Sequence, residues 1–170
     1  PTPSSAASDV YKRQIWDKSA SAGSSCAWGS FQSASNPCLR DVHEYLLVFS
    51  KGDYKLPRPK KEREAGRLDT IPRDDFIQHT KSIWSFATER ASRVNHPAPF
   101  PVELPKRCIE MYSFTGDVVL DPFNGSGTTC VAAKMHGRRY LGVDLSADYC
   151  AIAEERLSQT QAPDLDNIVV

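Results

Sequence analysis

The stretch Asp121–Thr129, DPFNGSGTT, decides the fold of this chain. Before it, Val118–Asp121 is a short apolar run that predicts a strand. After it, a helix is expected from about Thr128 to His136, ended by Gly137. Glycines at a strand-to-helix turn allow positive φ angles and let a ligand approach the backbone closely. The first N–H groups of the helix face such a ligand, so the stretch predicts a binding site.

Further elements continue this pattern on both sides of the stretch. Tyr140–Asp144, YLGVD, predicts a second strand that ends in an acid, and Ser146 is the expected N-cap of a helix that runs to about Ser158. Upstream, Leu104–Tyr112 has helical spacing and carries Pro105 in its first turn. The order strand, helix, strand, helix makes the two strands parallel through a right-handed crossover, so we expect an α/β fold with a largely parallel sheet.

The residues around the glycine turn narrow the choice of ligand. Asp144 follows Gly127 by 17 residues, at the strand end where carboxylates accept hydrogen bonds from ribose hydroxyls. A dinucleotide fingerprint requires a small third residue where this chain has Cys130, and Asp121 would repel a pyrophosphate. A P-loop requires a lysine that does not follow Gly127. A cationic nucleoside fits better, which favours S-adenosylmethionine; a purely structural glycine turn is the alternative.

The composition is that of an ordinary globular domain. The 170 residues are 40% apolar and 25% charged, which suffices for one packed core, and the zero net charge excludes a globally basic nucleic-acid binder. No apolar run is long enough to span a membrane, and no secretory signal opens the chain. The five cysteines lack C-x-x-C spacing and no histidine cluster stands out, so we expect free thiols and no metal site.

The ends of the chain differ from its middle. Residues 1–14 are small and polar, and we expect them to form a non-native or disordered leader. A single domain is expected over 15–160, followed by a flexible tail at 161–170. The domain begins on a core-like segment without a preceding strand, so the chain is expected to be truncated at its N-terminal side.

The first half of the domain is less regular than the second. Ile15–Lys18 closes a strand, and Glu44–Lys51, EYLLVFSK, predicts a buried strand that stops at Gly52. Between them, 19–37 is a serine-rich segment that is either functional or mobile. Trp84 is expected in the core rather than as a stacking platform.

The glycine stretch and its flanks resemble the amino-methyltransferases of DNA, which methylate the exocyclic amine of cytosine (N4) or adenine (N6). HPAPFPVELPKRCIEMYS precedes the stretch, RRYLGVDLSADYCAIAEERL follows it, and WDKSASAGSS and LRDVHEYLLVFSKG match further upstream. The resemblance covers Ile15–Leu157 and implies a Rossmann-like S-adenosylmethionine-dependent methyltransferase fold with a largely parallel, doubly wound sheet. It also implies the family's permuted order, with the catalytic half first and the cofactor half, here 96–158, last.

The resemblance also assigns roles to residues of the cofactor half. Asp144 is assigned to the ribose, and the proline-rich segment His96–Leu104 is assigned to closing over the methionine moiety, with a stiff linker as the alternative. Within that segment the contacts are expected from His96, Pro97 and Phe100. The residues assigned to the amino-acid end of the cofactor are Asp121, Phe123, Gly125, Ser126, Gly127 and Thr128.

The family's catalytic motif is absent from this sequence. That motif is Asp, Ser or Asn followed by Pro-Pro and an aromatic residue, which accept the target amine's protons and stack on a flipped base. No Pro-Pro pair occurs anywhere in the chain, so the motif is expected upstream of Pro1 and no catalytic residue is assigned. We therefore expect this chain alone to be inactive.

The resemblance implies double-stranded DNA as partner, in restriction–modification or phage self-protection, in the cytoplasm of a bacterium, an archaeon or a phage host. In the basic segment Lys55–Arg67, the residues Lys60, Lys61 and Arg63 are candidates for phosphate contacts, with a solvated loop as the alternative. Trp28 and Phe31 of the serine-rich segment are candidates to border the DNA cleft. Two other functions stay open: a non-catalytic module that binds S-adenosylmethionine or DNA, and a methyltransferase of RNA or small molecules.

Overall fold

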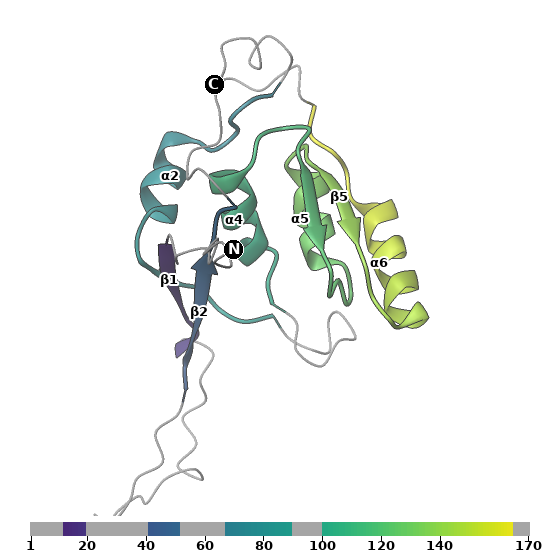
Figure 1. Ribbon diagram of the computed structural model, residues 1–170, viewed down its shortest axis with the longest axis horizontal. Coiled ribbons are helices and arrows are strands. Elements are labelled where there is room, and N and C mark those ends of the chain that lie inside the picture. Colours follow the sequence, from purple (N-terminus) through teal and green to yellow (C-terminus); the bar gives the residue numbers. More distant parts are fainter. Residues whose placement is uncertain (1–11, 20–40, 52–66, 90–99, 165–170) are drawn as a thin grey trace, which may run out of the picture. The chain divides into compact units, whose positions relative to one another are not determined.

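The computed structural model describes residues 12–19, 41–51, 67–89 and 100–164 (Figure 1). The chain separates into two compact units, where the sequence predicted one domain over 15–160. The first unit comprises 1–56 and 81–88, and the second comprises 57–80 and 89–170. Each unit is therefore discontinuous in sequence.

The first unit is built on a three-stranded sheet in the order β2-β1-β3. β1 (Lys12–Asp17) pairs antiparallel with β2 (His43–Val48) and parallel with β3 (Ile83–Ser85). Trp16 and Trp84, which are partners in the β1–β3 register, are 3% and 1% exposed. The expectation that Trp84 is a core residue is therefore confirmed.

Two details of this sheet differ from the sequence prediction. β1 begins at Lys12, so residues 12–14 belong to a strand and not to the predicted leader; residues 1–11 lie outside the described residues. β2 is not a buried strand, because Tyr45 and Leu47 are 56% and 50% exposed. β2 is an end strand in this sheet, and an antiparallel end strand needs only one buried face.

The second unit contains the elements that the glycine stretch predicted. β4 and β5 are parallel neighbours, with Val118 opposite Arg139 and Asp121 opposite Gly142. Among the described residues, no helix is long and apolar enough to cross a membrane. The elements of this unit are α2 (Arg73–His79), α4 (Glu103–Tyr112), β4 (Val118–Asp121), α5 (Thr128–Met135), β5 (Arg139–Gly142) and α6 (Ala147–Gln159).

Local signals determine the boundaries of these elements. The Ser146 side chain accepts a hydrogen bond from the backbone N–H of Tyr149 and caps α6 as predicted. α5 ends just before Gly137, which is in the left-handed region at φ 71°, also as predicted.

β5 ends at Gly142, two residues before the predicted end, so Asp144 lies in the loop that leads to α6. The sequence predicted neither α2 nor β3, which are short elements without a strong period.

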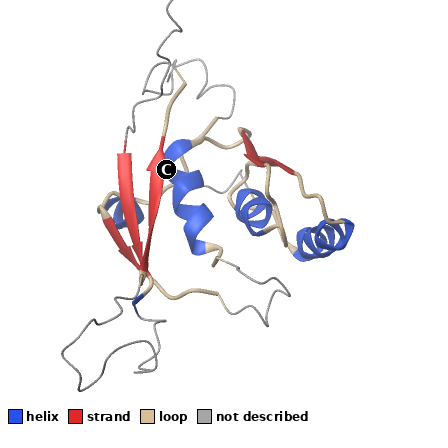
Figure 2. Cartoon of the chain, turned by 60° about the horizontal axis from the view of Figure 1, so that its bottom comes forward, coloured by secondary structure: helices blue, strands red, loops and turns tan. Residues whose placement is uncertain are grey.

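The core of the second unit lies between α5 and its neighbours. α5 packs against β4, β5, α4 and α6, and Figure 2 shows α5 and α6 nearly end-on at one side of the strand pair. Ile109 of α4 meets Ala132 and Ala133 of α5 in this core. These small alanines let α4 and the strands approach α5 closely.

The other side of the two strands is exposed. Leu120 and Leu141 are 58% and 55% exposed there, and none of the described helices covers them.

Candidate cofactor site

The backbone of the predicted binding turn is held by two glycines with positive φ. Gly125 has φ 49° and Gly127 has φ 81°, and the N–H of Gly127 donates to the carbonyl oxygen of Asn124 at 2.8 Å. A Cβ on Gly127 would lie 2.7 Å from the Cβ of Ala153 on α6. Both backbone conformation and packing therefore require glycine at position 127, which immediately precedes α5.

Asn124 connects the turn to the end of β5, although its position in the sequence did not indicate this role. Its N–H donates to the carbonyl oxygen of Val143 at 2.9 Å, and the thiol of Cys130 donates to its side-chain oxygen at 3.1 Å. A Cβ at Gly142 would lie 2.4 Å from Asn124 Cγ, so the missing side chain makes room for Asn124. Burial and the nearby Asp121 raise the pKa of Cys130 to about 11, which keeps the thiol protonated as a donor.

Two carboxylates lie at the carboxyl ends of the paired strands. Asp121 ends β4 and accepts a hydrogen bond from the N–H of Phe123 at 3.0 Å. Asp144 follows β5 and accepts from the N–H of Gly125 at 2.7 Å and from the N–H of Ser146 at 2.9 Å. Asp144 thereby ties the glycine turn to the start of α6. Because a carboxylate can accept about four hydrogen bonds, these backbone contacts leave the chemistry of a ribose-binding acid intact.

Ser126 and Thr128 are turned toward α6. Arg156 donates from Nη1 to the carbonyl oxygen of Ser126, to Ser126 Oγ at 3.0 Å and to Thr128 Oγ1 at 3.1 Å. Ser126 and Thr128 are 4% and 5% exposed. Their hydroxyls therefore stabilise the turn by bonding it to α6. Arg156 lies about 30 residues from the turn in sequence, and no motif spacing indicated this contact.

The other predicted site residues are distributed as follows. Phe123 is 88% exposed, which is unusual for a phenylalanine. Phe100 is half-buried and lies just before α4. The predicted site residues that fall outside the described residues are His96, Pro97, Lys60, Lys61 and Arg63, and the same is true of Trp28 and Phe31.

The arrangement has the chemistry that a cationic nucleoside requires. Gly125 and Gly127 hold the turn at positive φ, α5 begins directly after Gly127, and the carboxylates of Asp121 and Asp144 lie on either side of the turn. A phosphate group would meet the charge of Asp121, whereas an ammonium or sulfonium would be attracted by it. The residues present therefore fit S-adenosylmethionine.

Comparison with known sequences gives a consistent group of relatives. Residues 7–155 match the family N6_N4_Mtase, described as DNA methylase. The type II methyltransferase M.MthZI of Methanothermobacter thermautotrophicus is 34% identical over 138 residues, 78% of this chain and 39% of that protein. The orphan methyltransferase M.BamHII of Bacillus amyloliquefaciens is 50% identical over 142 residues, 68% of this chain and 54% of that protein. The chain thus spans about half or less of the length of these relatives.

Comparison with solved structures identifies the fold. TTHA0409 of Thermus thermophilus, described as a DNA modification methylase and solved with S-adenosyl-L-methionine, shares 36% identity at a TM-score of 0.66. The match covers 90% of this chain and 54% of that one. The PvuII DNA methyltransferase, which is cytosine-N4-specific, has the same fold at a TM-score of 0.60, with 21% identity over 95% of this chain and 53% of its own. The predicted methyltransferase fold is confirmed.

Proposed function

Because this chain belongs to the N6_N4_Mtase family of DNA methylases, we propose that it is the cofactor-binding portion of an enzyme that methylates DNA. The methyl donor is S-adenosylmethionine, and the acceptor is the exocyclic amine of cytosine (N4) or adenine (N6). The single observation that carries the proposal is the glycine turn of residues 122–127, which is hydrogen-bonded to Asp121 at the end of β4 and to Asp144 after β5.

Each part of the turn has a proposed role toward the cofactor. Asp144 accepts hydrogen bonds from the ribose hydroxyls, and Asp121 faces the positively charged methionine end. Gly125 and Gly127 allow close approach, and the exposed ring of Phe123 supplies apolar contact. Ser126 and Thr128 act through their backbone, because their hydroxyls are bonded to Arg156. His96, Pro97 and Phe100 are proposed to close over the methionine moiety.

The methyl transfer itself requires residues that this sequence does not contain. Bound S-adenosylmethionine supplies an electrophilic methyl group, but the target amine is a poor nucleophile because its lone pair is delocalised into the base. A Pro-Pro-aromatic motif would position that amine and hold the flipped base, and no Pro-Pro pair is present. We therefore propose that the 170-residue chain binds the cofactor and does not methylate DNA by itself.

The proposed partner is double-stranded DNA with its target base flipped out, and the proposed setting is the cytoplasm of a bacterium, an archaeon or a phage host. Lys60, Lys61 and Arg63 are proposed to contact phosphates. If they do, replacing all three by alanine weakens binding to every DNA sequence. It also flattens the slope of log affinity against log salt by up to about 0.9 per lost contact. An unchanged slope would assign the three residues to solvent.

Calorimetric titration of the 170-residue chain with S-adenosylmethionine and with S-adenosylhomocysteine tests the proposed cofactor site. Asp144→Asn should weaken both ligands equally, by about 10-fold or more, because both carry the ribose. Asp121→Asn should weaken both ligands, because both carry the ammonium, and should weaken S-adenosylmethionine more, because only that ligand also carries the sulfonium charge. Asp148→Asn, on the exposed side of α6, is the matched control. Unchanged affinity in a folded Asp144→Asn variant would remove this residue from the site.

Methyl transfer is measured separately. Radiolabelled S-adenosylmethionine and unmethylated DNA are incubated with this chain alone, and we expect no incorporation. Turnover by the chain alone would show that catalytic residues lie within it, and would overturn the assignment of a binding portion without overturning the cofactor site.

A further inference from the structure

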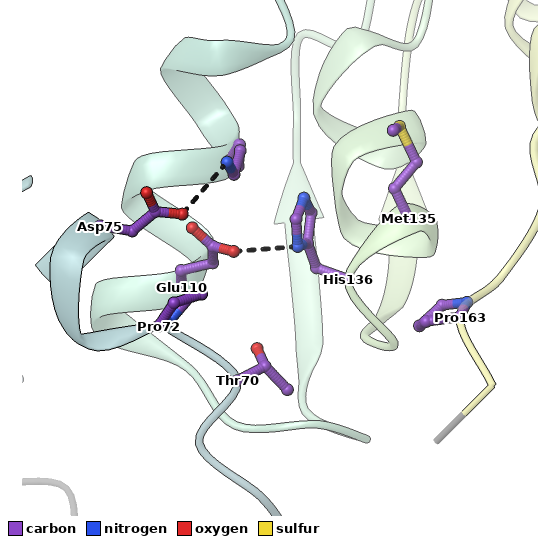
Figure 3. A pocket seen from close by; sticks show the side chains of 8 residues that line it. Thr70, Pro72, Asp75, Glu110, Met135, His136 and Pro163 are labelled. Carbon is purple, nitrogen blue, oxygen red and sulfur yellow. Dashed lines mark ion pairs between the residues drawn. The ribbon is translucent and has the colours of Figure 1, made fainter. Parts of the chain in front are cut away.

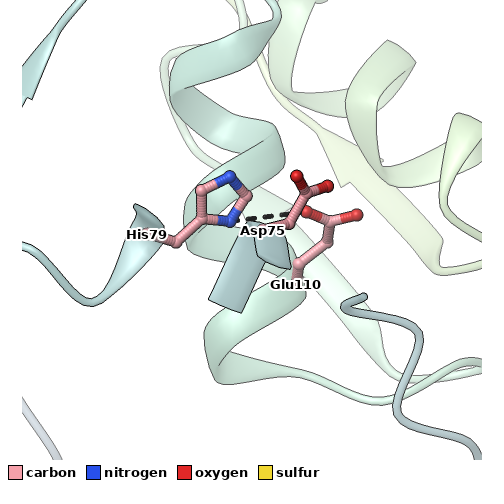
Figure 4. Close-up of side chains that lie close together, drawn as sticks. All are labelled: Asp75, His79 and Glu110. Carbon is pink, nitrogen blue, oxygen red and sulfur yellow. Dashed lines mark ion pairs between the residues drawn. The ribbon is translucent and has the colours of Figure 1, made fainter. Parts of the chain in front are cut away.

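Three side chains with metal-binding chemistry converge between α2 and α4, away from the glycine turn. Asp75 and His79 lie four residues apart on one face of α2, and Glu110 projects from α4 toward them (Figure 4). One ligand atom of each residue lies within 4.8 Å of the other two. The Nδ1 atom of His79 is 3.7 Å from Oε2 of Glu110.

The buried carboxylate of Glu110 is the observation that points to a ligand. Its side chain is 3% exposed, and Oε2 has no hydrogen-bond donor among the described residues. The other oxygen, Oε1, lies 3.1 Å from Nδ1 of His136. A buried carboxylate oxygen that no donor satisfies is costly, and a cation at this position would remove that cost.

Two further groups lie close to the three residues. A histidine ligand commonly donates its second ring N–H to a carboxylate, and the Oε1 atom of Glu103, at 4.0 Å from Nε2 of His79, would have to move closer to accept it. Glu110 also has a neighbour of its own, because Nδ1 of His136 lies 3.1 Å from its Oε1 atom.

A cavity gives access to this cluster. It measures about 330 Å³, and Asp75, Glu110 and His136 all contribute to its lining (Figure 3). Asp75 is 43% exposed, so its carboxylate can adjust. Lys106 lies 3.7 Å from Asp75 and lines the cavity as well, and its flexible, partly exposed ammonium would have to turn away when a cation binds.

We propose that Asp75, His79 and Glu110 bind one Zn²⁺ ion, which fastens α2 to α4. One imidazole and two carboxylates suit zinc, and a water from the cavity completes four-fold coordination. Ligands at about 2.0–2.2 Å from a tetrahedral zinc lie roughly 3.4 Å apart. The 3.7 Å separation of His79 and Glu110 is near this value. The ligand atom of Asp75 lies within 4.8 Å of the other two and would move toward them when the ion binds.

The test is a calorimetric titration of the 170-residue chain with Zn²⁺, with Mg²⁺ as a second probe. We expect one zinc site, a rise in Tm of several degrees at saturating zinc, and no binding of Mg²⁺. Asp75→Asn, Glu110→Gln and His79→Asn should each weaken zinc at least 10-fold. Asp75 is partly exposed, so its variant stays informative if the buried variants fail to fold.

His43→Asn, in the first unit, is the matched control and should bind zinc as the unchanged chain does. Substitution of Co²⁺ for Zn²⁺ gives a second readout, because a tetrahedral site with nitrogen and oxygen ligands produces strong visible absorption, which Asp75→Asn should remove. Absence of zinc binding by the folded chain would overturn the proposal. So would zinc affinity that is unchanged in Asp75→Asn and Glu110→Gln, because the ion would then be bound elsewhere, for instance by cysteines.

Discussion

At the scale of single residues, the glycine turn depends on two separate constraints at Gly127. The positive φ of 81° strains any L side chain, and the contact with Ala153 leaves no room for a Cβ. Gly116 provides a comparison, because it has a similar φ of 76° with nothing within 4 Å of a built Cβ. The two positions therefore separate backbone strain from crowding.

Gly127→Ala should destabilise the chain more than Gly116→Ala. Strain at positive φ costs about 1–2 kcal/mol at either position, and overpacking against α6 adds about 1–3 kcal/mol at Gly127 alone. Urea denaturation of the two variants measures the difference. Adding Ala153→Gly to Gly127→Ala should restore part of the loss. Equal destabilisation of the two glycine variants would show that α6 does not constrain the turn.

At the scale of elements, Arg156 links α6 to the start of α5. Its guanidinium is bonded to the carbonyl oxygen of Ser126 and to the hydroxyls of Ser126 and Thr128, and both of these residues are buried. Arg156→Met keeps much of the side-chain volume and leaves these acceptors without their donor. The expected loss is about 1–3 kcal/mol of unfolding free energy, together with weaker S-adenosylmethionine binding.

The control for Arg156 is Arg73→Met. Arg73 is 87% exposed and lies 3.7 Å from Asp74, so its loss should change the unfolding free energy by less than about 0.5 kcal/mol. Chemical denaturation and cofactor titration of both variants check the prediction. It fails if Arg156→Met is as stable as the Arg73 variant.

Where β1 pairs with β3, the carboxylate of Asp17 has a lowered pKa. Asp17 accepts a hydrogen bond from Ser85 Oγ at 2.6 Å and from the N–H of Ser19 at 2.8 Å, and these bonds lower the pKa of Asp17 from 3.8 to about 2. A lowered pKa in the folded state stabilises the fold above pH 3.8, and this contribution is lost as the pH falls toward 2. In an NMR titration, Ser85→Ala should move the pKa of Asp17 upward, whereas an unchanged value would assign the shift to Ser19 alone.

At the scale of the whole molecule, one face of the β4–β5 pair carries exposed apolar side chains. Leu120 and Leu141 are paired neighbours in the register and are both more than half exposed. Val118 of β4 is 55% exposed, and Val143, which directly follows β5, is 50% exposed. Exposed apolar surface next to a strand pair favours association between copies.

We therefore expect the 170-residue chain to self-associate through this face at high concentration. Leu120→Thr combined with Leu141→Thr should lower light scattering and keep Tm nearly constant, because threonine preserves β-propensity and neither leucine is buried. A strong fall in Tm would show that the two leucines are packed in solution. Unchanged scattering with an unchanged Tm would locate the association elsewhere.

The sequence by itself determined the elements from Glu103 to Gln159 and the glycine turn between β4 and α5. These elements follow local rules: glycines at the turn, Ser146 at a cap, and apolar periods that belong to one helix or strand. The core position of Trp84 was also predicted and is confirmed. Signals of this kind lie within a few residues of one another, so they can be read without knowing the fold.

Only the tertiary structure decided which distant residues meet. Arg156 reaches Ser126 and Asp144 reaches Gly125 because α6 and β5 pack beside the turn, not because of any spacing in the chain. Asp75 and Glu110 are 35 residues apart, and a helix packing brings them together where composition predicted no ligand cluster. β1 pairs with β3 across nearly 70 residues, and β3 therefore belongs to the first unit although the segment before it belongs to the second. Contacts of this range depend on how whole elements pack, which local periodicity does not encode.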